Sequence, residues 1–576
     1  MKKTWRTINS LISKKVNQSI IKKLLYNNIE FTSEKEIADV LNTYFSSVGN
    51  DLDARIPSTT LDPLHYMDLN FDRSFWLNPV SNLEVEFLIK SLKNSKHDLN
   101  SIAITILKDN ASFLSVIIAG IINQSFFAGK FPVVLKKALV LPLFKKGDTT
   151  SASNYRPISI LHWLSKVFEK CIKSRLLNYI CSNNIINPVQ YGFQPGISTQ
   201  DAILHVTEKL YSNLNKKLAT IGIFIDFSKC FDTINHCILI RKLERYGIRG
   251  LPLQLLISYL ENRCQTVKIG NTFSEKLDIG IGVPQGSVLG PILFLLYVNE
   301  IPNICRNFTS CLFADDTTFL SSGYNIDSLF HSCNEALEKF SGWCCANRLS
   351  VNVTKTNFML ISNRIHPTLP AITFNNISIE CSSSVRFLGV ELEEKLKFEN
   401  HINNIARKIS KNTGILSKLA YFVPKSVLVT LYHSLIEPYL NYCPIIFGGA
   451  YSSLIRPLEV AQRKSVRIIS RANSQAHSNP LFACLGVLKF NDLYKIQLGI
   501  YTFKNFENFT LSSSTHNYYM RNSSFNPVFQ RLTLTQRQSV AYQAPSNWNS
   551  IPLEIRNAPT LKTFKNRYKK YLVSLY

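Results

Sequence analysis

The sequence is short of acidic residues, of regularly spaced cysteines and of long apolar runs. Its 39 Asp and Glu stand against 65 Lys and Arg, a formal net charge of +26. The 13 cysteines include no CxxC pair and no Cys/His spacing typical of zinc, which favours free thiols in a reducing compartment. The longest apolar run, Val288 to Val298, contains a Gly-Pro and is well below the roughly 20 residues that span a bilayer. The start of the chain also lacks the apolar segment of a secretory signal. We therefore expect neither secretion nor membrane insertion.

Positive charge is what the sequence has instead, and it is concentrated in the last third. Residues 401–576 contain 22 Lys and Arg but only 5 Asp and Glu, a balance of +17. Self-repulsion disfavours such a surface in a free globular protein, so a polyanionic partner is indicated. A merely basic soluble protein is the alternative. Contact with phosphates would make binding weaken steeply with salt.

The length and the apolar content predict a folded chain of several subdomains. At 576 residues with 45% hydrophobic residues, two to four packed subdomains are expected. The first 55 residues are predicted to be helical, and Ser81 and Glu84 to form a capping box at the start of a helix. Beyond residue 400 the pattern is mainly helical and basic.

Two strands that carry aspartates are the main sign of chemistry. Asp226 ends the apolar strand predicted within residues 217–232, and Asp315 and Asp316 lie at the tip of a hairpin predicted at residues 309–322. A carboxylate at the end of a strand can leave the core while the preceding residues stay buried. Carboxylates brought together repel one another unless cations bind, and carboxylate and phosphate oxygens are the ligands that Mg²⁺ prefers. Two such ions can activate a 3′-hydroxyl and stabilise a leaving pyrophosphate. Taken alone, an Asp-Asp hairpin tip is more often a solvated turn.

Seven motifs, in order, make the sequence resemble the reverse transcriptases of non-LTR retrotransposons, most closely the jockey-like group. The resemblance covers the chain from about Ile37 to the C-terminus. The motifs are LFKKGDTTSASNYRPISIL, PVQYGFQPGISTQDAI, FIDFSKCFDTINH, GVPQGSVLGPILFLLYVNEI, FADDTTF, WCCANRLSVNVTKT and VRFLGVEL. The resemblance implies an α+β right-hand polymerase fold, with fingers, an antiparallel palm sheet with helices, a helical thumb and a basic helical C-terminal region.

The resemblance also implies how the metal ions would be held. Asp226 and Asp315 would be the principal metal ligands, with Asp316 beside them in a supporting role. The carbonyl of Phe227 would complete one metal shell. Two Mg²⁺ ions are expected, with Mn²⁺ as a possible substitute.

Three further residues match positions near the incoming nucleotide. Phe231 falls where the family carries its steric gate, a ring that would clash with a 2′-hydroxyl and so select deoxynucleotides. A core aromatic beside a strand is the alternative. Gln285 and Gly286 match the loop that lets template and nucleotide approach the backbone, which glycine permits because it has no Cβ.

The remaining matches are basic residues and a short hairpin. Arg156, and Lys145 or Lys146, would contact the triphosphate, since a planar guanidinium suits bidentate phosphate binding. Arg156 as a structural cap of the fingers is the alternative. Lys355 matches the block that can supply a proton to the pyrophosphate, although surface lysines are usually only solvated. Residues 387–389 (Phe387, Leu388 and Gly389) match the primer-gripping hairpin, with core packing as the competing interpretation.

The sequence departs from the family in one loop. Where the family commonly has SxGxDGI, residues 94–104 lack both glycines, so activity could be impaired if this loop contacts template or nucleotide. In addition, YVNEI replaces the usual YVNDI, a milder change.

We expect three regions along the chain. Residues 1–78 would be an N-terminal helical extension, 79–400 the fingers and palm, and 401–576 the helical thumb and a basic RNA-binding region. An RNase H domain is not expected, because only five acidic residues follow residue 400. The polymerase blocks begin near residue 37, so an endonuclease would come from a missing segment or another protein.

The predicted reaction is RNA-directed DNA synthesis from dNTPs on a primer 3′-hydroxyl. By resemblance it would serve target-primed reverse transcription, with element RNA as template, nicked DNA as primer, and a nuclear and cytoplasmic location. A catalytically decayed copy that only binds RNA is one alternative. A group II intron maturase or a viral RNA polymerase is another. The oligomeric state cannot be predicted.

Overall fold

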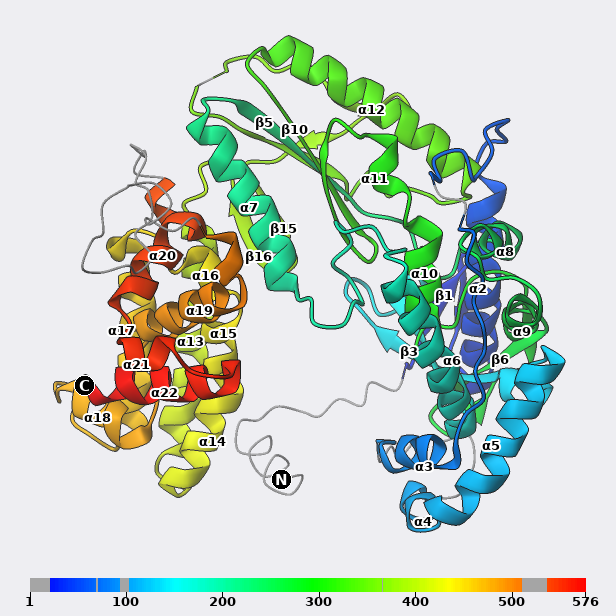
Figure 1. Cartoon of the computed structure of the whole chain (residues 1–576), viewed down its shortest axis with the longest axis horizontal. Coiled ribbons are helices and arrows are strands. Elements are labelled where there is room, and N and C mark those ends of the chain that lie inside the picture. The colour runs from blue at the N-terminus through cyan, green and yellow to red at the C-terminus, as the bar shows by residue number, and fades with distance from the viewer. Residues whose placement is uncertain (1–20, 69–70, 94–102, 365, 510–535) are drawn as a thin grey trace.

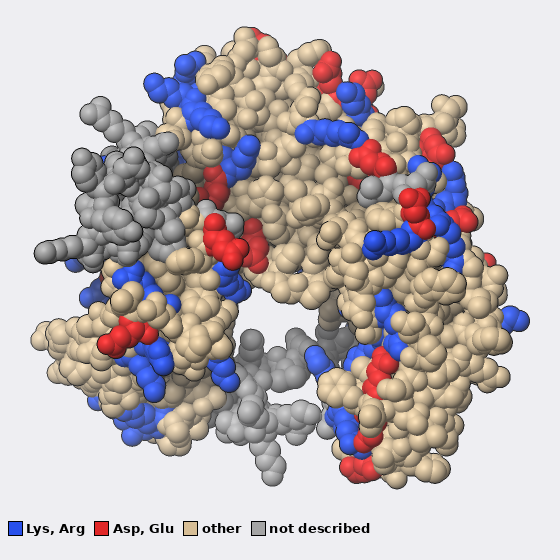
Figure 2. Space-filling view, viewed as in Figure 1, with Lys and Arg blue, Asp and Glu red and all other residues tan. Residues whose placement is uncertain are grey.

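The computed structural model describes residues 21–68, 71–93, 103–364, 366–509 and 536–576. The protein is a mixed α/β structure in which a central sheet joins two lobes (Figure 1). One lobe contains most of the described residues from 21 to about 300, and the other contains the helices from residue 399 onward. An open hollow separates the lower parts of the two lobes (Figure 2).

The central sheet has five strands in the order β14-β11-β5-β10-β9. Neighbouring strands are antiparallel, except that β11 and β14 are parallel. This largely antiparallel sheet is consistent with the expected palm. Its strands are β5 (Ala219–Ile225), β9 (Thr309–Phe313), β10 (Asp316–Gly323), β11 (Asn357–Ile361) and β14 (Glu380–Cys381).

Both faces of the central sheet are covered, which explains why β5 is a continuous apolar run. Ile221 and Ile223 belong to one core, formed with α10 (Gly290–Val298) and α12 (Ile326–Ala346). Phe224 belongs to a second core, formed with α7 (Thr199–Asn215) and the C-terminal helices. Successive side chains point to opposite faces of a strand, so one strand contributes to both cores.

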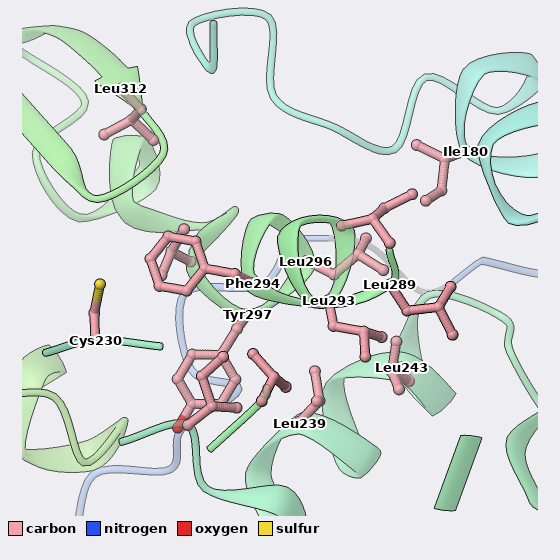
Figure 3. Packing of buried hydrophobic residues seen from close by; sticks show 14 of the residues in the cluster. Ile180, Cys230, Leu239, Leu243, Leu289, Leu293, Phe294, Leu296, Tyr297 and Leu312 are labelled. Atoms are coloured by element: carbon pink, nitrogen blue, oxygen red, sulfur yellow. The ribbon is translucent and has the colours of Figure 1, made fainter. Parts of the chain in front are cut away.

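Helix α10 is buried on all sides, as expected for a helix that is hydrophobic all round. The helix packs against α8 (His236–Arg245), and Figure 3 shows Leu293 beside Leu243 of α8, with Phe294 on the side of the helix toward Cys230. The helix follows directly from the loop of residues 282–289. Burial of α10 therefore fixes the end of that loop relative to the central sheet.

A second sheet lies in the lobe that contains the N-terminal helices. Its order is β4-β3-β6-β7, and β8 also pairs with β6. Helix α2 (Glu34–Ala54) packs on β6, where the Gln265 side-chain amide donates to Asn42 Oδ1 over 3.0 Å. A Cβ at Gly49 of α2 would lie 2.3 Å from the carbonyl oxygen of Asp232, so glycine is needed for this close approach. The strands are β3 (Lys137–Phe144), β4 (Tyr155–Leu161), β6 (Arg263–Ile269), β7 (Thr272–Phe273) and β8 (Leu277–Ile279).

The helices at the outer end of this lobe expose one apolar face. Of the described helices, only α5 (Ala111–Ala128) is long and apolar enough to cross a membrane by length and composition, which is weak evidence taken alone. One face of α5 packs against α3 (Asn82–Lys90) and α9 (Leu251–Leu260). The opposite face exposes Phe113 and Phe127. The other helices of the lobe are α4 (Ile104–Asp109), α6 (Trp163–Ser182) and α11 (Ile301–Ile304).

The second lobe is helical, as its sequence predicts. Helices α13 (Glu399–Leu419) and α17 (Ser452–Ile469) lie against each other and share the second core. Glu208 of α7 accepts hydrogen bonds from the backbone N–H groups of Val540 and Ala541, which ties the start of α20 (Val540–Ser550) to the central sheet. The remaining helices are α14 (Lys425–Leu435), α15 (Glu437–Asn441), α16 (Pro444–Phe447), α18 (Ser478–Leu485), α19 (Phe490–Lys504), α21 (Leu553–Arg556) and α22 (Leu561–Ser574).

Some local predictions are wrong. Residues 24–31 form a hairpin, β1 (Leu24–Tyr26) and β2 (Ile29–Phe31), where helix was predicted. Ser81 caps α3 as predicted, but the Glu84 carboxylate pairs with Arg175 of α6 at 2.8 Å instead of closing a capping box. VRFLGVEL forms the hairpin that the resemblance implies, from β15 (Ser384–Phe387) and β16 (Val390–Glu393). A further short hairpin pairs β12 (Thr373–Phe374) with β13 (Ile377–Ser378). The altered loop at 94–104 falls mostly on residues 94–102, outside the described residues.

Candidate active site

Strand pairing brings the three predicted aspartates to one end of the central sheet. Thr317 of β10 lies opposite Ile225 of β5. Asp226 directly follows Ile225, and Asp316 directly precedes Thr317. Asp315 occupies the turn between β9 and β10, after Ala314 at a φ of +57°. The carboxylates that the sequence predicted to converge are therefore at adjacent strand ends.

The electrostatic state of these carboxylates shows that they repel one another. Asp315 and Asp316 are open to solvent, but protein surrounds them closely enough to remove much of their hydration. Desolvation, followed by the charges of Asp315 and Asp226, raises the pKa of Asp316 to about 6. Desolvation and the charge of Asp226 raise the pKa of Asp315. Both effects disfavour three ionised carboxylates without a cation among them.

Three cationic side chains face this end of the sheet. Lys355 Nζ lies 3.3 Å from Asp226 Oδ2, and both side chains are about half exposed. Arg156 of β4 and Lys145 are close enough to Asp315 to oppose the rise of its pKa. Desolvation and the nearby charges of Arg156 and Lys355 lower the pKa of Lys145. The structure thus groups Arg156, Lys145 and Lys355 near the aspartates, while their contact with a triphosphate or pyrophosphate stays a prediction.

The side chains present fit a divalent cation by their chemistry. Three carboxylates with no thiolate or imidazole among them are a hard oxygen donor set of the kind Mg²⁺ takes. Among the described residues, however, no group of three His, Cys, Asp or Glu side chains is already arranged around a metal position. The carboxylates would have to draw together as ions bind.

Phe227 and Phe231 lie on the chain that leaves β5. The backbone of Phe227 forms a bridge with Val351, and its side chain is buried near Phe340. Phe231 is half-buried and stacks on Phe294 of α10 with ring centroids 4.7 Å apart. Its carbonyl also accepts a hydrogen bond from the N–H of Val283, over 2.8 Å. The Phe231 ring is therefore held in place at the edge of the first core.

The loop that contains Gln285 and Gly286 lies directly on strand β4. The N–H of Ser159 donates to the carbonyl of Gln285 over 2.8 Å. Gly286 has a φ of +115°, and a Cβ there would lie 2.7 Å from the carbonyl oxygen of Ser159. By family resemblance, this glycine lets template and nucleotide approach the backbone. The structure adds a second reason for glycine at this position, which is the close approach of Gly286 to strand β4.

Asp232 is a site residue that the sequence analysis missed. The side-chain amide of Gln285 donates to both of its carboxylate oxygens, over 2.9 and 2.8 Å. Burial raises the pKa of Asp232 to about 6. The residue lies next to Phe231 and thereby ties the Phe231 segment to the Gln285 loop. It stands in a quoted motif, but nothing in the sequence shows that Gln285, 53 residues later, is its partner.

Gln190 is a second residue that the sequence analysis missed. It is fully buried, and its side-chain oxygen accepts from the N–H groups of Gly192 and Ala314. A Cβ at Gly192 would lie 2.3 Å from the backbone nitrogen of Ala314. The segment around Gln190 therefore braces the turn that carries Asp315. A buried polar residue inside a quoted motif was the only signal for this role.

The predicted primer-gripping residues combine packing with an exposed turn. Phe387 is buried and contacts Phe224 of β5, as the packing alternative proposed. Leu388 and Gly389 form the β15–β16 turn, with φ values of +44° and +88°. The hydroxyl of Tyr442 donates to the carbonyl of Leu388. The turn is thus clamped by the second lobe.

Comparisons with known proteins match the region that contains these residues. The family model described as "Reverse transcriptase (RNA-dependent DNA polymerase)" matches residues 144–392. That span includes every predicted site residue.

Three relatives illustrate the similarity over the rest of the chain. The RNA-directed DNA polymerase from mobile element jockey of Drosophila melanogaster is 29% identical over 448 residues, covering 74% of this chain and 48% of the relative. The probable RNA-directed DNA polymerase from transposon BS, from the same organism, is 28% identical over 71% of this chain and 46% of the relative. The retrovirus-related Pol polyprotein from type-1 retrotransposable element R1 of Bradysia coprophila is 28% identical over 52% of this chain and 30% of the relative. The chain spans about half the length of the jockey and BS relatives. Residues 144–392 match the reverse transcriptase family model, and about 70% of the chain is similar to the RNA-directed DNA polymerases of jockey and transposon BS.

Proposed function

We propose that the chain synthesises DNA on an RNA template by two-metal nucleotidyl transfer. The observation that carries the proposal is the meeting of Asp226, Asp315 and Asp316 at adjacent strand ends, inside the reverse transcriptase domain. Bound Mg²⁺ would activate the primer 3′-hydroxyl and stabilise the leaving pyrophosphate.

The chain's own residues have separate tasks in this proposal. Asp226 and Asp315 would hold the cations, Asp316 would support them, and the carbonyl of Phe227 would add an oxygen ligand. Arg156 and Lys145 bind the triphosphate of the incoming dNTP. Lys355, which is paired with Asp226 in this structure, donates a proton toward the pyrophosphate. These tasks need a desolvated and crowded site. The raised pKa values of Asp315 and Asp316 are consistent with such a site.

The wider context is part of the same proposal. The helices that follow residue 399 would act as thumb and as a basic RNA-binding region, and the element's RNA and a nicked DNA end would be template and primer. Target-primed reverse transcription in the nucleus, after synthesis in the cytoplasm, would use a nick made by a nuclease. The net charge of +17 over residues 401–576 supports phosphate contact by these helices.

The metal requirement provides the first test. RNA-templated primer extension should require Mg²⁺, stop when the ion is chelated and return when Mg²⁺ or Mn²⁺ is added. Deoxynucleotides should be used in preference to ribonucleotides. Extension that continues with the same yield in excess chelator would contradict a metal-dependent centre.

Removal of the Phe231 ring is expected to relax sugar selection. The ring stacks on Phe294 and would lie under the sugar, so Phe231→Val opens space for a 2′-hydroxyl. The preference for dNTP over rNTP, as a ratio of kcat/KM values, should fall on the order of a hundredfold, because a steric pocket then ceases to discriminate. Single-nucleotide incorporation measures this ratio.

The matched control is Phe273→Val, which alters an exposed ring on β7. It should leave the ratio unchanged. If Phe231→Val extends primers with dNTPs and still rejects rNTPs as strongly as the unaltered chain, Phe231 is a core aromatic and not a gate.

A further inference from the structure

The turn between α13 and α14 presents two adjacent aromatic side chains to solvent. Tyr421 is 87% exposed and Phe422 is 73% exposed. Large aromatic rings are usually buried or placed at binding surfaces, because their apolar faces are poorly solvated. We call residues 420–424 the aromatic turn.

The aromatic turn is held rigidly although its rings are free of the core. Arg471, directly beyond α17, donates from Nη2 to the carbonyls of Ala420 and Val423, over 3.0 and 3.1 Å. The N–H of Phe422 donates to the carbonyl of Leu419 over 2.9 Å. These bonds fix the backbone on both sides of the rings. Binding of a ligand to the rings would therefore cost little further conformational entropy.

The surroundings of the aromatic turn are positively charged. Residues 401–436 contain no Asp or Glu, and neither do residues 460–491. Lys418, Lys425 and Arg471 are exposed beside the rings. None of the three forms an ion pair with a described residue. On the face seen in Figure 2, the lower part of this lobe carries more Lys and Arg than Asp and Glu. The turn thus combines two stacking faces with cations that have no acidic partner among the residues described.

We propose that the aromatic turn is a stacking site for unpaired nucleobases. Tyr421 and Phe422 would each receive the face of one base of a single strand, while Lys418 and Lys425 contact the phosphates on either side. Stacking on aromatic rings in a basic groove is how proteins bind single strands without sequence preference, because every base has a π-face. The site lies outside the reverse transcriptase domain of residues 144–392. It extends the proposed function, on whose RNA-binding role it rests, by naming residues that contact bases and not only phosphates.

An acidic protein or an anionic lipid surface would also suit cations and rings. Neither an acidic protein nor a lipid surface requires two aromatic rings held at adjacent positions by a rigid turn. Successive bases of a single strand require such a pair, because each base stacks on one ring. Unpaired nucleic acid is therefore the favoured occupant. RNA and DNA strands share this chemistry, so both are used in the test.

The test measures how binding affinity depends on salt when either the two aromatic rings or the two lysine charges are removed. Full-length protein is titrated with rA20 and dA20 at several salt concentrations. The double substitution Tyr421→Ala, Phe422→Ala should weaken binding of the preferred strand about 10- to 100-fold without changing the salt slope, since stacking releases no counterions. The double substitution Lys418→Gln, Lys425→Gln should instead lower the salt slope, by about 0.7 for each phosphate that is no longer neutralised.

An abasic strand of the same length identifies the bases as the partner. The unaltered chain should bind the abasic strand about as weakly as the aromatic double variant binds rA20 or dA20. The aromatic double variant should bind the abasic strand and the strand with bases equally weakly. Tyr421→Phe, Phe422→Tyr should preserve binding because both stacking faces remain. Phe113→Ala, Phe127→Ala removes two equally exposed rings from α5, which has no Lys or Arg of its own, and should have no effect.

Each result decides between defined alternatives. If the aromatic double variant binds both strands within twofold of the unaltered chain while DNA synthesis proceeds, the stacking site is refuted and the proposed function stands. If the unaltered chain binds no strand even at low salt, both proposals fail. If vesicles of anionic phospholipid bind through the two rings and displace no strand, the turn is a lipid contact.

Discussion

Asp315→Asn is expected to lower the rate of RNA-templated DNA synthesis by at least about a thousandfold, equivalent to about 4 kcal/mol of transition-state stabilisation. Asn keeps the shape of the side chain but removes the negative charge that would hold a cation beside the reacting phosphate. The turn itself should persist, because Gln190 binds Ala314 and the β9–β10 pairs are formed by backbone groups.

The stability of the Asp315→Asn protein separates catalysis from folding. Desolvation and Asp226 already raise the pKa of Asp315, so removal of its charge relieves repulsion in the metal-free protein. The midpoint of thermal unfolding without metal should therefore stay the same or rise. Asp278→Asn, on an exposed part of β8, is the matched control and should retain full activity. Activity of Asp315→Asn within tenfold of the unaltered chain would contradict the site assignment.

Lys242→Met is expected to lower the free energy of unfolding by about 3–5 kcal/mol, because it leaves a buried charge without its partner. Lys242 is completely buried and forms an ion pair with Glu300. Its ammonium group also lies 4.6 Å from the ring centroid of Tyr297, and Trp343 Nε1 donates to Glu300 over 3.0 Å. The pair therefore joins α8, α10 and α12 beneath the central sheet.

A double substitution distinguishes loss of pairing from loss of packing. Lys242→Met with Glu300→Leu removes both charges and should recover most of the stability that the single substitution removes. The exposed neighbour Arg241, which pairs with Asp62 at 3.1 Å, provides the control. Arg241→Met should cost at most about 1 kcal/mol. Denaturant unfolding followed by circular dichroism measures all three, and a decrease below about 1 kcal/mol for Lys242→Met would show that the pair contributes little.

The catalytic strands could be predicted because their sequence signals are local. β5 is a run of buried residues that ends one residue before Asp226, and β9 and β10 flank an Asp-Asp turn. The meeting of the two strand ends followed from family resemblance and is confirmed by the pairing of Thr317 with Ile225. The site roles of Phe231, Gln285, Arg156 and Lys355 remain predictions.

The features that were missed depend on interactions between distant segments. Asp232 and Gln285 meet across 53 residues, and Gln190 and Ala314 across 124. The Glu84 carboxylate does not close its predicted capping box and pairs instead with Arg175, 91 residues away. None of these partners can be read from local periodicity.

Primer extension on a poly(rA)–oligo(dT) duplex with dTTP and Mg²⁺ tests the central claim most directly. The unaltered chain is run beside the double variant Asp315→Ala, Asp316→Ala, and binding of both proteins to RNA is measured as a function of salt. We expect extension by the unaltered chain alone, with equal and salt-sensitive RNA binding by both proteins. Absence of extension by the unaltered chain, with RNA binding retained, would contradict the polymerase and indicate a decayed copy that only binds RNA.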